Sequence, residues 1–528
     1  MSCPTDLLDV LKAGGLDEAA ANALCSHFSS KNDLSGVRYG LNSAWLVLCG
    51  ALVFIMHGGF AMLCAGAIRS KNTLNILLQT ILDACVSAIM FYTVGFAFAY
   101  GVGDNPNTFI GDAVFAMARW SSNPTGTGEG RWTDWFFQWA FAATATTIPA
   151  GCVAERFNFN AYLAYTIFVS GWIYPIVVHW VWSANGWLSY FQYPGEPGKT
   201  WHLFRSGMID YAGSAVIHMT GGFTGMMGAW LVGPRLGRFD SMGNPVDMPG
   251  HSVVLTVLGT VLLWFGWYGF NPGSVLVIDS ATSGEVAARA AVTTTLSGAA
   301  GGLTCLINAW RRNKAWDLVS LCNGVLVGFV SITAGAHVVE PWAALIAGFV
   351  GGLIFDGMCW VFLKLKIDDP LSAAPMHGWC GAWAVFFVGL LAKPEYVRQS
   401  YARDEYHWGA FYPHSSGRLF AAQVIGILTI GAWVIGLSSL LFLGLKLAGK
   451  LRISEEDEHR GLDRSKHGGS VYNHYSDPVT AKNTGQVEID LTQDYNLTEK
   501  QQSFKPLNYN DDALQQTPGL PKENGNGI

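Results

Sequence analysis

The chain has 528 residues, of which half are hydrophobic and only 13% are charged. A soluble protein of this size carries about a quarter charged residues, so the composition excludes an ordinary soluble protein and favours one with several membrane spans. The net charge of −6 comes without a basic patch suited to nucleic acid, so we expect no nucleic-acid partner.

Apolar runs recur along the chain, each near the roughly 20 residues that a membrane-spanning helix needs. They predict an all-α polytopic membrane protein with eleven transmembrane helices, and the odd number places the two termini on opposite sides. The predicted helices cover residues 43–67, 75–100, 134–154, 160–183, 211–233, 251–271, 283–310, 316–337, 341–363, 372–392 and 418–447.

The predicted spans divide the chain into four parts. Residues 1–42 form an N-terminal segment, and residues 43–447 form the transmembrane domain. Residues 448–470 are expected to be a short ordered tail. Residues 471–528 are polar, rich in Asn, Gln, Asp and Lys, and are expected to be disordered.

Basic residues predict the orientation. Arg235 and Arg238 lie in one short connection, and Arg311 and Arg312 begin another of the same set, whereas the alternate connection 272–282 has no Lys or Arg. Since Lys and Arg are enriched in cytoplasmic loops, we expect an extracellular N-terminus and a cytosolic tail.

Two of the predicted spans carry histidine in similar surroundings. In DYAGSAVIHMTGGF (210–223) Asp210 precedes His218 by eight residues, and in DPLSAAPMHGWCGAW (369–383) Asp369 precedes His377 by eight residues. One span enters from outside and the other from inside. Eight helical residues rise about 12 Å, so both histidines are expected to meet near the middle of a core about 30 Å thick.

The repeated spacing of aspartate and histidine also predicts the topology. Five helices separate the two histidines, which indicates two inverted five-helix repeats plus a C-terminal helix, an arrangement typical of transporters. Ionisable groups inside a membrane are rare and usually functional. The alternatives are that each histidine bonds a neighbouring helix and that the aspartates cap helix N-termini.

Two buried imidazoles would stay neutral, because burial disfavours the charged form. Sharing one N–H···N bond, they would leave one donor and one acceptor for a small polar molecule or a relayed proton. No carboxylate or cysteine ligand set accompanies them, and no CxxC or nucleophile motif appears. We therefore expect no metal, no cofactor and no enzyme activity.

Several motifs resemble those of one known family. DYAGSAVIHMTGGF (210–223) resembles the signature of the Amt/Mep/Rh ammonium transporters, and FGWYGFNPGS (265–274), ITAGAHVVEPWAA (332–344) and DDPLSAAPMHGWCG (368–381) also fit. Their order is similar to that of the plant-type Amt branch, and the likeness covers about residues 43–470. It implies a homotrimer in the plasma membrane, with a narrow pore in each subunit for ammonium or ammonia and for methylammonium.

The resemblance also implies roles for individual residues. Trp182, Phe141 and Ser274 match the outer vestibule that recruits the ammonium ion, and aromatic faces do attract small cations. For any one of these aromatics alone, packing against lipid or core would be the better interpretation. The remaining matches are Phe141 with Phe270 as the pore gate, His218 and His377 as the pore histidines, and Asp210, Trp267 and Thr333 as supporting or lining residues.

The implied mechanism is high-affinity-type transport. Moving an intact ammonium ion through an apolar pore is costly, so the ion is expected to lose its proton, ammonia to cross, and the twin histidines to relay the proton, with net movement of charge. The alternatives are a neutral ammonia channel and an ammonium sensor (transceptor).

The segment LRISEEDEHRGLDRSKHGG (451–469) resembles the family's regulatory tail, which docks on the neighbouring subunit. Gly461 fits its pattern, and Ser465 stands where plant members carry a phosphorylatable threonine. A kinase is therefore an expected partner, because a phosphate would add nearly two negative charges. The alternative is a solvated serine in a flexible tail.

Three further residues raise questions. His57 stands where a related plant sequence usually has Gln, and it is interpreted as a hydrogen-bonding partner of a neighbouring helix or as a titratable group near the vestibule. Cys3 and Cys25 could pair within or between subunits.

Overall fold

The computed structural model describes residues 12–15, 17–31, 34–103, 107–118, 132–191, 203–401 and 405–472. Within these ranges the secondary structure is helical, without a β-strand. The predicted disorder after residue 472, the residues around Cys3 and the side chain of Cys25 lie outside the described part. Residues 1–11, 16, 32 and 33 of the predicted segment 1–42 also lie outside it.

Nine helical stretches are long and apolar enough to cross a membrane, so the chain is a multi-span membrane protein. Several of them are built from consecutive helical pieces. They are α3 (Ser35–Ala67), η1 (Ser70–Asn72) with α4 (Thr73–Met90), η2 (Phe91–Gly95) and α5 (Phe96–Tyr100), α7 (Phe159–Phe168) with η4 (Val169–Ile173) and α8 (Tyr174–Trp182), η6 (Ser214–Met219) with α9 (Thr220–Val232), α10 (Val253–Phe270) with η7 (Pro272–Val275), α11 (Ala281–Asn313), α13 (Pro341–Lys364), η8 (Ala374–Trp379) with α14 (Cys380–Leu391), and α16 (Arg418–Leu447).

The other two predicted spans are also helices. They are α6 (Trp132–Val153) and α12 (Leu318–Thr333), and α12 is shorter than the others. Both lie deep in the protein, since every residue from Phe137 to Val153 except Trp139 is buried and so is every residue from Gly324 to Thr333. Each of the eleven predicted runs is therefore a helix here, while length and composition alone define nine spans.

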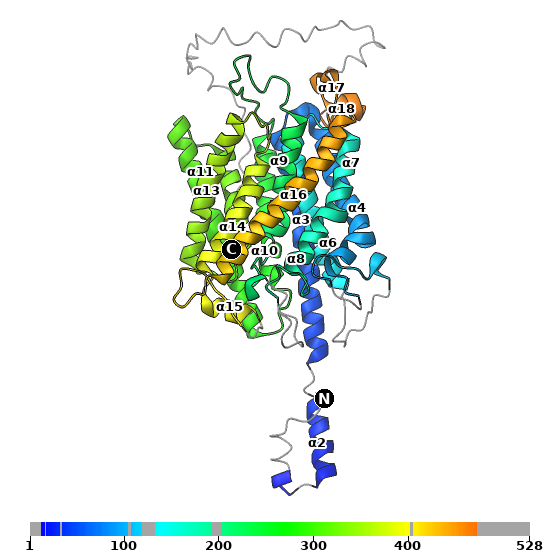
Figure 1. Cartoon of the computed structure of the whole chain (residues 1–528), viewed down its shortest axis with the longest axis vertical. Helices are drawn as coiled ribbons and strands as arrows, with labels where there is room; N and C mark the ends of the chain where they lie inside the picture. Colours follow the sequence, from blue (N-terminus) through cyan, green and yellow to red (C-terminus); the bar gives the residue numbers. More distant parts are fainter. Residues whose placement is uncertain are drawn as a thin grey trace, which may run out of the picture. The chain divides into compact units, whose positions relative to one another are not determined.

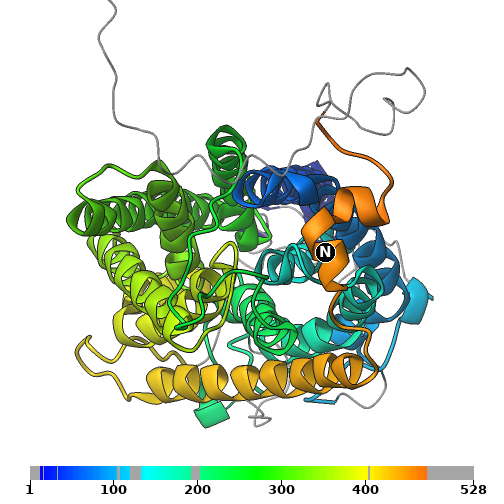
Figure 2. The same ribbon diagram turned by 90° about the horizontal axis from the view of Figure 1, so that it is seen from above.

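The long helices lie side by side (Figure 1). α3 packs along α10, and α11, α12 and α13 pack against one another. α16 contacts α9 and α14 and lies along one edge of the bundle when the protein is seen from above (Figure 2). The described part also contains α2 (Glu18–Lys31), η3 (Phe115–Met117), η5 (Leu203–Arg205) and the short helix α15 (Pro394–Ser400).

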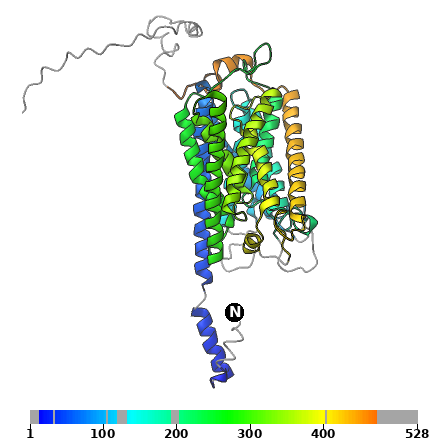
Figure 3. The same cartoon turned by 90° about the vertical axis from the view of Figure 1, so that its left-hand side faces the viewer.

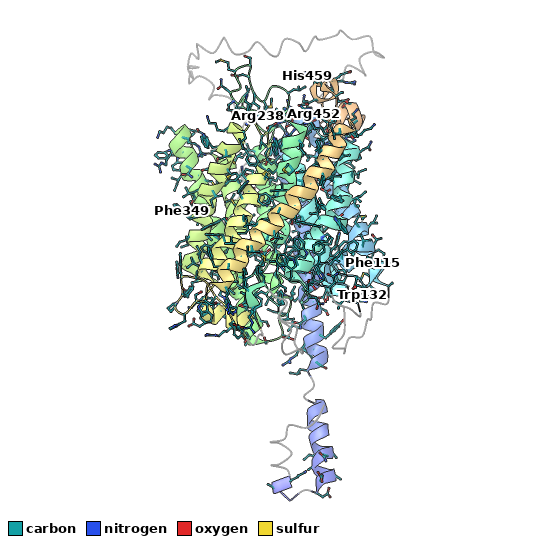
Figure 4. All side chains as sticks on the ribbon, viewed as in Figure 1. Phe115, Trp132, Arg238, Phe349, Arg452 and His459 are labelled. Carbon is teal, nitrogen blue, oxygen red and sulfur yellow. The ribbon has the colours of Figure 1, made fainter. Side chains whose placement is uncertain are left out.

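Two short helices, α17 (Glu455–Arg460) and α18 (Leu462–Lys466), follow α16. They lie at one end of the bundle, opposite the end that carries α15 (Figures 1 and 3). Arg238, Arg452 and His459 share the end with α17, whereas Phe115 and Trp132 lie at the other end (Figure 4). The tail and the start of α6 are thus on opposite faces.

A buried ion network joins the connections beneath the tail. Arg235 donates to both carboxylate oxygens of Asp368, at 2.8 and 3.1 Å, and its other nitrogen lies 2.8 Å from Glu155. Arg69 also pairs with Glu155, and Arg238 pairs with Asp368. Because these charges are paired and hydrogen-bonded, they can be held away from water.

Glycine lets the two histidine-bearing helices touch. A Cβ atom added at Gly222 in α9 would lie 2.1 Å from the backbone nitrogen of Gly378 in η8. Such a contact is far inside van der Waals distance, so only a hydrogen at this position allows the two backbones to approach. Small residues commonly permit this packing in membrane helices.

Candidate functional site

A cavity of about 430 Å³ opens beside the first turns of α6. Phe141, Trp182 and Ser274, the three residues predicted to recruit a cation, all line it. They come from α6, α8 and η7, so the structure brings together side chains that lie far apart in sequence. We call this cavity the outer vestibule.

Hydrogen bonds hold the vestibule walls. Trp182 Nε1 donates to the backbone oxygen of Asp210 at 2.7 Å, and the Phe141 ring meets the Trp182 ring edge-on with centroids 5.9 Å apart. The Ser274 hydroxyl donates to the Phe270 carbonyl at 2.8 Å. The hydroxyl proton is therefore engaged, and the oxygen lone pairs can still accept a hydrogen bond from an N–H donor.

Two phenylalanine rings close the inner side of the vestibule. Phe141 and Phe270 have ring centroids 4.4 Å apart, inclined by 31°, and both side chains are fully buried. Phe270 in turn lies 5.6 Å from the imidazole of His218. The predicted gate pair is thus placed directly between the vestibule and the histidines.

His218 and His377 contact each other in the core. Their Nδ1 atoms are 3.1 Å apart, and the rings are nearly parallel, with an interplanar angle of 14°. One Nδ1 must carry the proton and the other must accept it, so the pair shares one hydrogen bond. His218 Nε2 is enclosed and has no hydrogen-bond partner among the described residues.

Both histidines sit in a π-helical turn, which the sequence reading missed. η6 carries His218 and η8 carries His377, and single π turns inside α-helices are often found at functional sites. The aspartates cap these turns. Asp210 accepts the N–H groups of Ala215 and Val216 at 2.9 Å.

Asp369 makes the matching contact in the second repeat, where its carboxylate accepts the Ala374 N–H at 2.8 Å. The capping interpretation of the two aspartates therefore agrees with the hydrogen bonds. Little in the sequence indicates these π turns. The residue that comes nearest to doing so is Gly213, a glycine directly before η6 whose backbone has a φ of 102°.

The predicted lining residues surround His218. The Trp267 indole stacks on His218 with centroids 5.5 Å apart, and its Nε1 donates to the Thr333 hydroxyl at 3.3 Å. Two aromatics that the sequence reading did not select also belong here. The Phe60 ring lies 6.3 Å from His377, and the Phe329 ring lies 5.1 Å from Trp267.

His57 differs from expectation. Its side chain is buried in α3 and lies 5.6 Å from the Phe54 ring, but neither ring nitrogen has a hydrogen-bond partner among the described residues. The interpretation that His57 bonds a neighbouring helix is therefore wrong here. His57 is also absent from the lining of the outer vestibule.

The tail docks on the first connection of its own chain. Leu462 N donates to Asn72 Oδ1 at 2.9 Å, and Asp463 accepts the N–H groups of Leu74 and Asn75 at the start of α4. Gly461 has a φ of 87°, and a Cβ there would lie 2.6 Å from Lys71. The resemblance predicted docking on a neighbouring subunit, whereas these contacts lie within one chain.

Ser465 belongs to the docked segment. It neighbours Asp457, whose carboxylate lies 2.8 Å from Lys466 and accepts from Ser454. The hydrogen bonds from Lys466 and then Ser454 lower the pKa of Asp457. The carboxylate is thus ionised at neutral pH, and its ion pair with Lys466 links α17 to α18.

A vestibule, an aromatic gate and a buried histidine pair within a bundle of membrane spans define a transport protein with a narrow pore. Residues 44–472 match the model of the Ammonium Transporter Family. The chain belongs to this family of transporters, which are not enzymes and whose substrate is ammonium.

Plant proteins are among its relatives. The chain is 43% identical over 471 residues to "Ammonium transporter 1 member 3" of Solanum lycopersicum, covering 86% of this chain and 97% of the relative. It is 43% identical over 490 residues to "Ammonium transporter 1 member 1" of Arabidopsis thaliana, covering 91% and 95%. The plant-type resemblance is confirmed.

Solved structures agree with the fold. A protein described as "Sensor Amt Protein" matches with a TM-score of 0.70 and 33% identity over 81% of this chain and 99% of that one. Mep2 of Saccharomyces cerevisiae matches with a TM-score of 0.67 and 28% identity over 79% and 88%. The all-helical Amt/Mep fold, with its inverted repeats, is therefore the fold of this chain.

Proposed function

We propose that this chain is a high-affinity-type transporter that moves ammonium, and also methylammonium, across the plasma membrane by separating the proton from ammonia. The observation that carries the proposal is the Nδ1 contact of 3.1 Å between His218 and His377 directly beneath the rings of Phe141 and Phe270. The N-terminus is extracellular and the tail is cytosolic, so the vestibule faces outward.

Recruitment takes place in the outer vestibule. The ring faces of Trp182 and Phe141 attract a small cation, and the Ser274 oxygen accepts one of its N–H bonds. The gate rings exclude water below this point. An ion that enters the gate must therefore give up most of its hydration.

Dehydration decides the mechanism. Carrying a bare ammonium ion through an apolar pore costs far more than carrying ammonia, because an isolated charge in a low-dielectric medium is strongly disfavoured. The ion therefore leaves its proton near the gate. Ammonia crosses beside Trp267 and the histidines, and the proton passes along the shared N–H···N bond.

Transport is electrogenic in this mechanism, because the proton follows the ammonia. Potassium has no proton to release, so a pore that dehydrates the ion rejects it. A neutral ammonia channel remains the mechanistic alternative, in which the proton returns to the outside.

The tail regulates the pore. Three subunits form a homotrimer, and a kinase that phosphorylates Ser465 places nearly two negative charges beside Asp457. Repulsion between the phosphate and this carboxylate separates α17 from α18. The tail then leaves the first connection and the pore closes.

An ammonium sensor is the second candidate. It is favoured by the likeness to the solved "Sensor Amt Protein", which this chain matches over 99% of that protein's length. A sensor would bind ammonium at the vestibule without a large flux. Transport and sensing make different predictions for current.

The test is voltage clamp with parallel uptake of labelled methylammonium, comparing the wild type with His218→Ala at equal surface level. Saturable ammonium current that ignores potassium in the wild type, and is lost or becomes unselective in the variant, supports the proposal. Uptake without current favours the neutral channel. Binding of ammonium without uptake or current favours the sensor.

A further inference from the structure

His337 is a buried imidazole that the proposed mechanism does not use. It lies in the connection 334–340 between α12 and α13, and its side chain is 1% exposed. Its ring stacks face to face on the ring of Tyr211, with centroids 3.9 Å apart and an interplanar angle of 13°. The Tyr211 N–H also donates to the Ala334 carbonyl at 3.0 Å. Because Tyr211 lines the outer vestibule and His337 does not, His337 acts on the vestibule through Tyr211.

The backbone that carries His337 is held by two neighbouring helices. Arg289 Nε, in α11, donates to the His337 carbonyl at 2.6 Å. The N–H of Lys393, directly before α15, donates to the Val338 carbonyl at 2.8 Å. The position of this backbone is therefore fixed by contacts that do not involve Tyr211.

The orientation of the imidazole is fixed as well. His337 Nε2 and the Tyr401 hydroxyl share a hydrogen bond of 2.9 Å, and the Tyr401 ring meets the imidazole edge-on with centroids 5.4 Å apart. Tyr401 directly follows α15, and Arg289 binds this helix by donating to Gln399 Oε1 at 2.7 Å. The imidazole thus presents a rigid flat face to Tyr211.

The backbone on either side of Tyr211 sets the position of the Trp182 indole. Trp182 Nε1 donates to the Asp210 carbonyl at 2.7 Å. A Cβ atom added at Gly213 would lie 3.1 Å from the Trp182 ring, so the indole packs directly on this backbone. The path from His337 to Trp182 therefore consists of one stacked ring and one short backbone segment.

We propose that His337 is a positioning residue for ammonium recruitment, which fixes the orientation of the Trp182 indole by stacking on Tyr211. The proposal rests on the proposed transport function and extends it to a residue outside the vestibule lining. An aromatic ring attracts a cation only when the ion lies over its face, within about 6 Å of the centroid. A displaced indole therefore weakens recruitment, and the apparent affinity changes while the passage of ammonia beyond the gate does not.

The test is a double-mutant cycle between His337→Ala and Trp182→Phe, measured as the apparent KM of ammonium-evoked current at equal surface level. Trp182→Phe keeps an aromatic ring and removes the N–H that bonds the Asp210 carbonyl. Each single variant should raise KM about three- to tenfold, and the double variant no further than the larger single effect, because both break the same path. In His337→Ala the maximal current should stay close to that of the wild type.

Ser274→Ala is the matched control for the cycle. Ser274 belongs to the same recruitment site, but it lies in η7 and its hydroxyl bonds the Phe270 carbonyl rather than the backbone beside Tyr211. Its effect on KM should therefore multiply with that of His337→Ala. Multiplication with Ser274→Ala but not with Trp182→Phe locates the effect of His337 at the indole.

Two further variants test the stacked contact itself. His337→Phe keeps a flat ring against Tyr211 and loses the bond to Tyr401, whereas His337→Leu fills the space without a flat face. KM should be close to that of the wild type in His337→Phe and raised in His337→Leu, since stacking needs an aromatic ring. If His337→Ala does not reach the cell surface, His337→Leu takes its place in the cycle.

The possible results separate positioning from a purely structural role. Effects of His337→Ala and Trp182→Phe that multiply in the double variant overturn the proposal, and so do equal KM values in His337→Phe and His337→Leu. A residue that only holds the fold together would lower the surface level of His337→Leu and leave its KM unchanged, and this result also overturns the proposal. A wild type with neither ammonium current nor methylammonium uptake instead refutes the transport function on which the proposal rests.

Discussion

His218 and His377, 159 residues apart in the chain, place their Nδ1 atoms 3.1 Å from each other with nearly parallel rings. Each lies in a π turn whose first N–H groups are capped by an aspartate. The shared hydrogen bond makes the two residues one unit. Changes in either should therefore have the same consequence.

The first prediction is non-additivity at this pair. His218→Ala, His377→Ala and the double variant should lose the preference of the pore for ammonium over potassium to a similar degree, because each removes the same shared bond. The measurement is the ratio of ammonium to potassium current in all three. Losses that multiply in the double variant would show that the histidines act independently.

The second prediction concerns the helix contact beside the pair. Gly222→Ala should destabilise the protein by about 1–3 kcal/mol, because the added methyl group collides with the backbone of Gly378 and forces the helices apart. Thermal unfolding in detergent measures the loss, and the current should fall with it. Gly436→Ala is the control, since a Cβ at Gly436 in α16 meets no neighbouring atom within 4 Å. Equal melting of the two variants would contradict the close contact.

The third prediction is acid sensitivity of the Arg235–Asp368 pair. Burial by itself raises the pKa of Asp368, but the hydrogen bonds from Arg235 and the charges of Arg156 and Arg235 outweigh burial and lower the pKa to about 2. A carboxyl group whose pKa is depressed on folding stabilises the protein above its unfolded pKa near 4. That stabilisation is lost as the pH falls from about 4 to about 2.

Asp368→Asn should remove this dependence. It should also lower the free energy of unfolding at neutral pH by about 3 kcal/mol, because it removes one of the two carboxylates that pair with the buried guanidinium of Arg235 and leaves only Glu155. Thermal unfolding of wild type and variant between pH 7 and pH 3 measures both effects. A wild type whose stability falls no faster than that of the variant below pH 4 would rule the pair out as the cause.

The fourth prediction concerns the tail. Ser465→Asp should reduce the current several-fold through repulsion of the neighbouring Asp457. Ser465→Ala should transport like the wild type, because the Ser465 hydroxyl is enclosed without a geometric hydrogen-bond partner among the described residues. Ser470→Asp, five residues further on in an exposed position, is the matched control. Currents are compared at equal surface level. Identical currents in all four proteins would leave no role for a phosphate at Ser465.

Docking can be tested separately from charge. Gly461→Ala places a methyl group 2.6 Å from Lys71 and forces a side chain into the left-handed region. It should release the tail and raise its sensitivity to limited proteolysis. Gly468→Ala, also at a positive φ but with no atom within 4 Å, shares the backbone strain without the collision. The contrast isolates the contact with Lys71.

Much of this architecture could be predicted from local pattern. Each predicted apolar run is a helix. A run of about 20 apolar residues favours a membrane helix whether its side chains later contact lipid or other helices, so the prediction needs no information about neighbouring segments. α6 and α12 show the limit of that rule. Both are covered by other helices: α6 carries several Thr residues and is not apolar enough to count as a span, and α12 is apolar but has only 16 residues.

The site was predictable only where a motif or a spacing existed. The eight-residue interval before each histidine indicated that Asp210 and Asp369 are equivalent, and the family likeness indicated Trp182, Phe141 and Phe270. Gln138, which also lines the vestibule, belongs to no such motif. Its place in the vestibule wall depends on how α6, α8 and η7 meet.

The sequence by itself determined the membrane class, the helical runs, the inverted repeat and the family, because hydropathy, spacing and motifs are local properties of the chain. Only the tertiary structure decided that the histidines share a hydrogen bond, that π turns present them, and that Gly222 lies against Gly378. Those features depend on backbone contacts between segments more than 150 residues apart, and no local pattern encodes the distance between them.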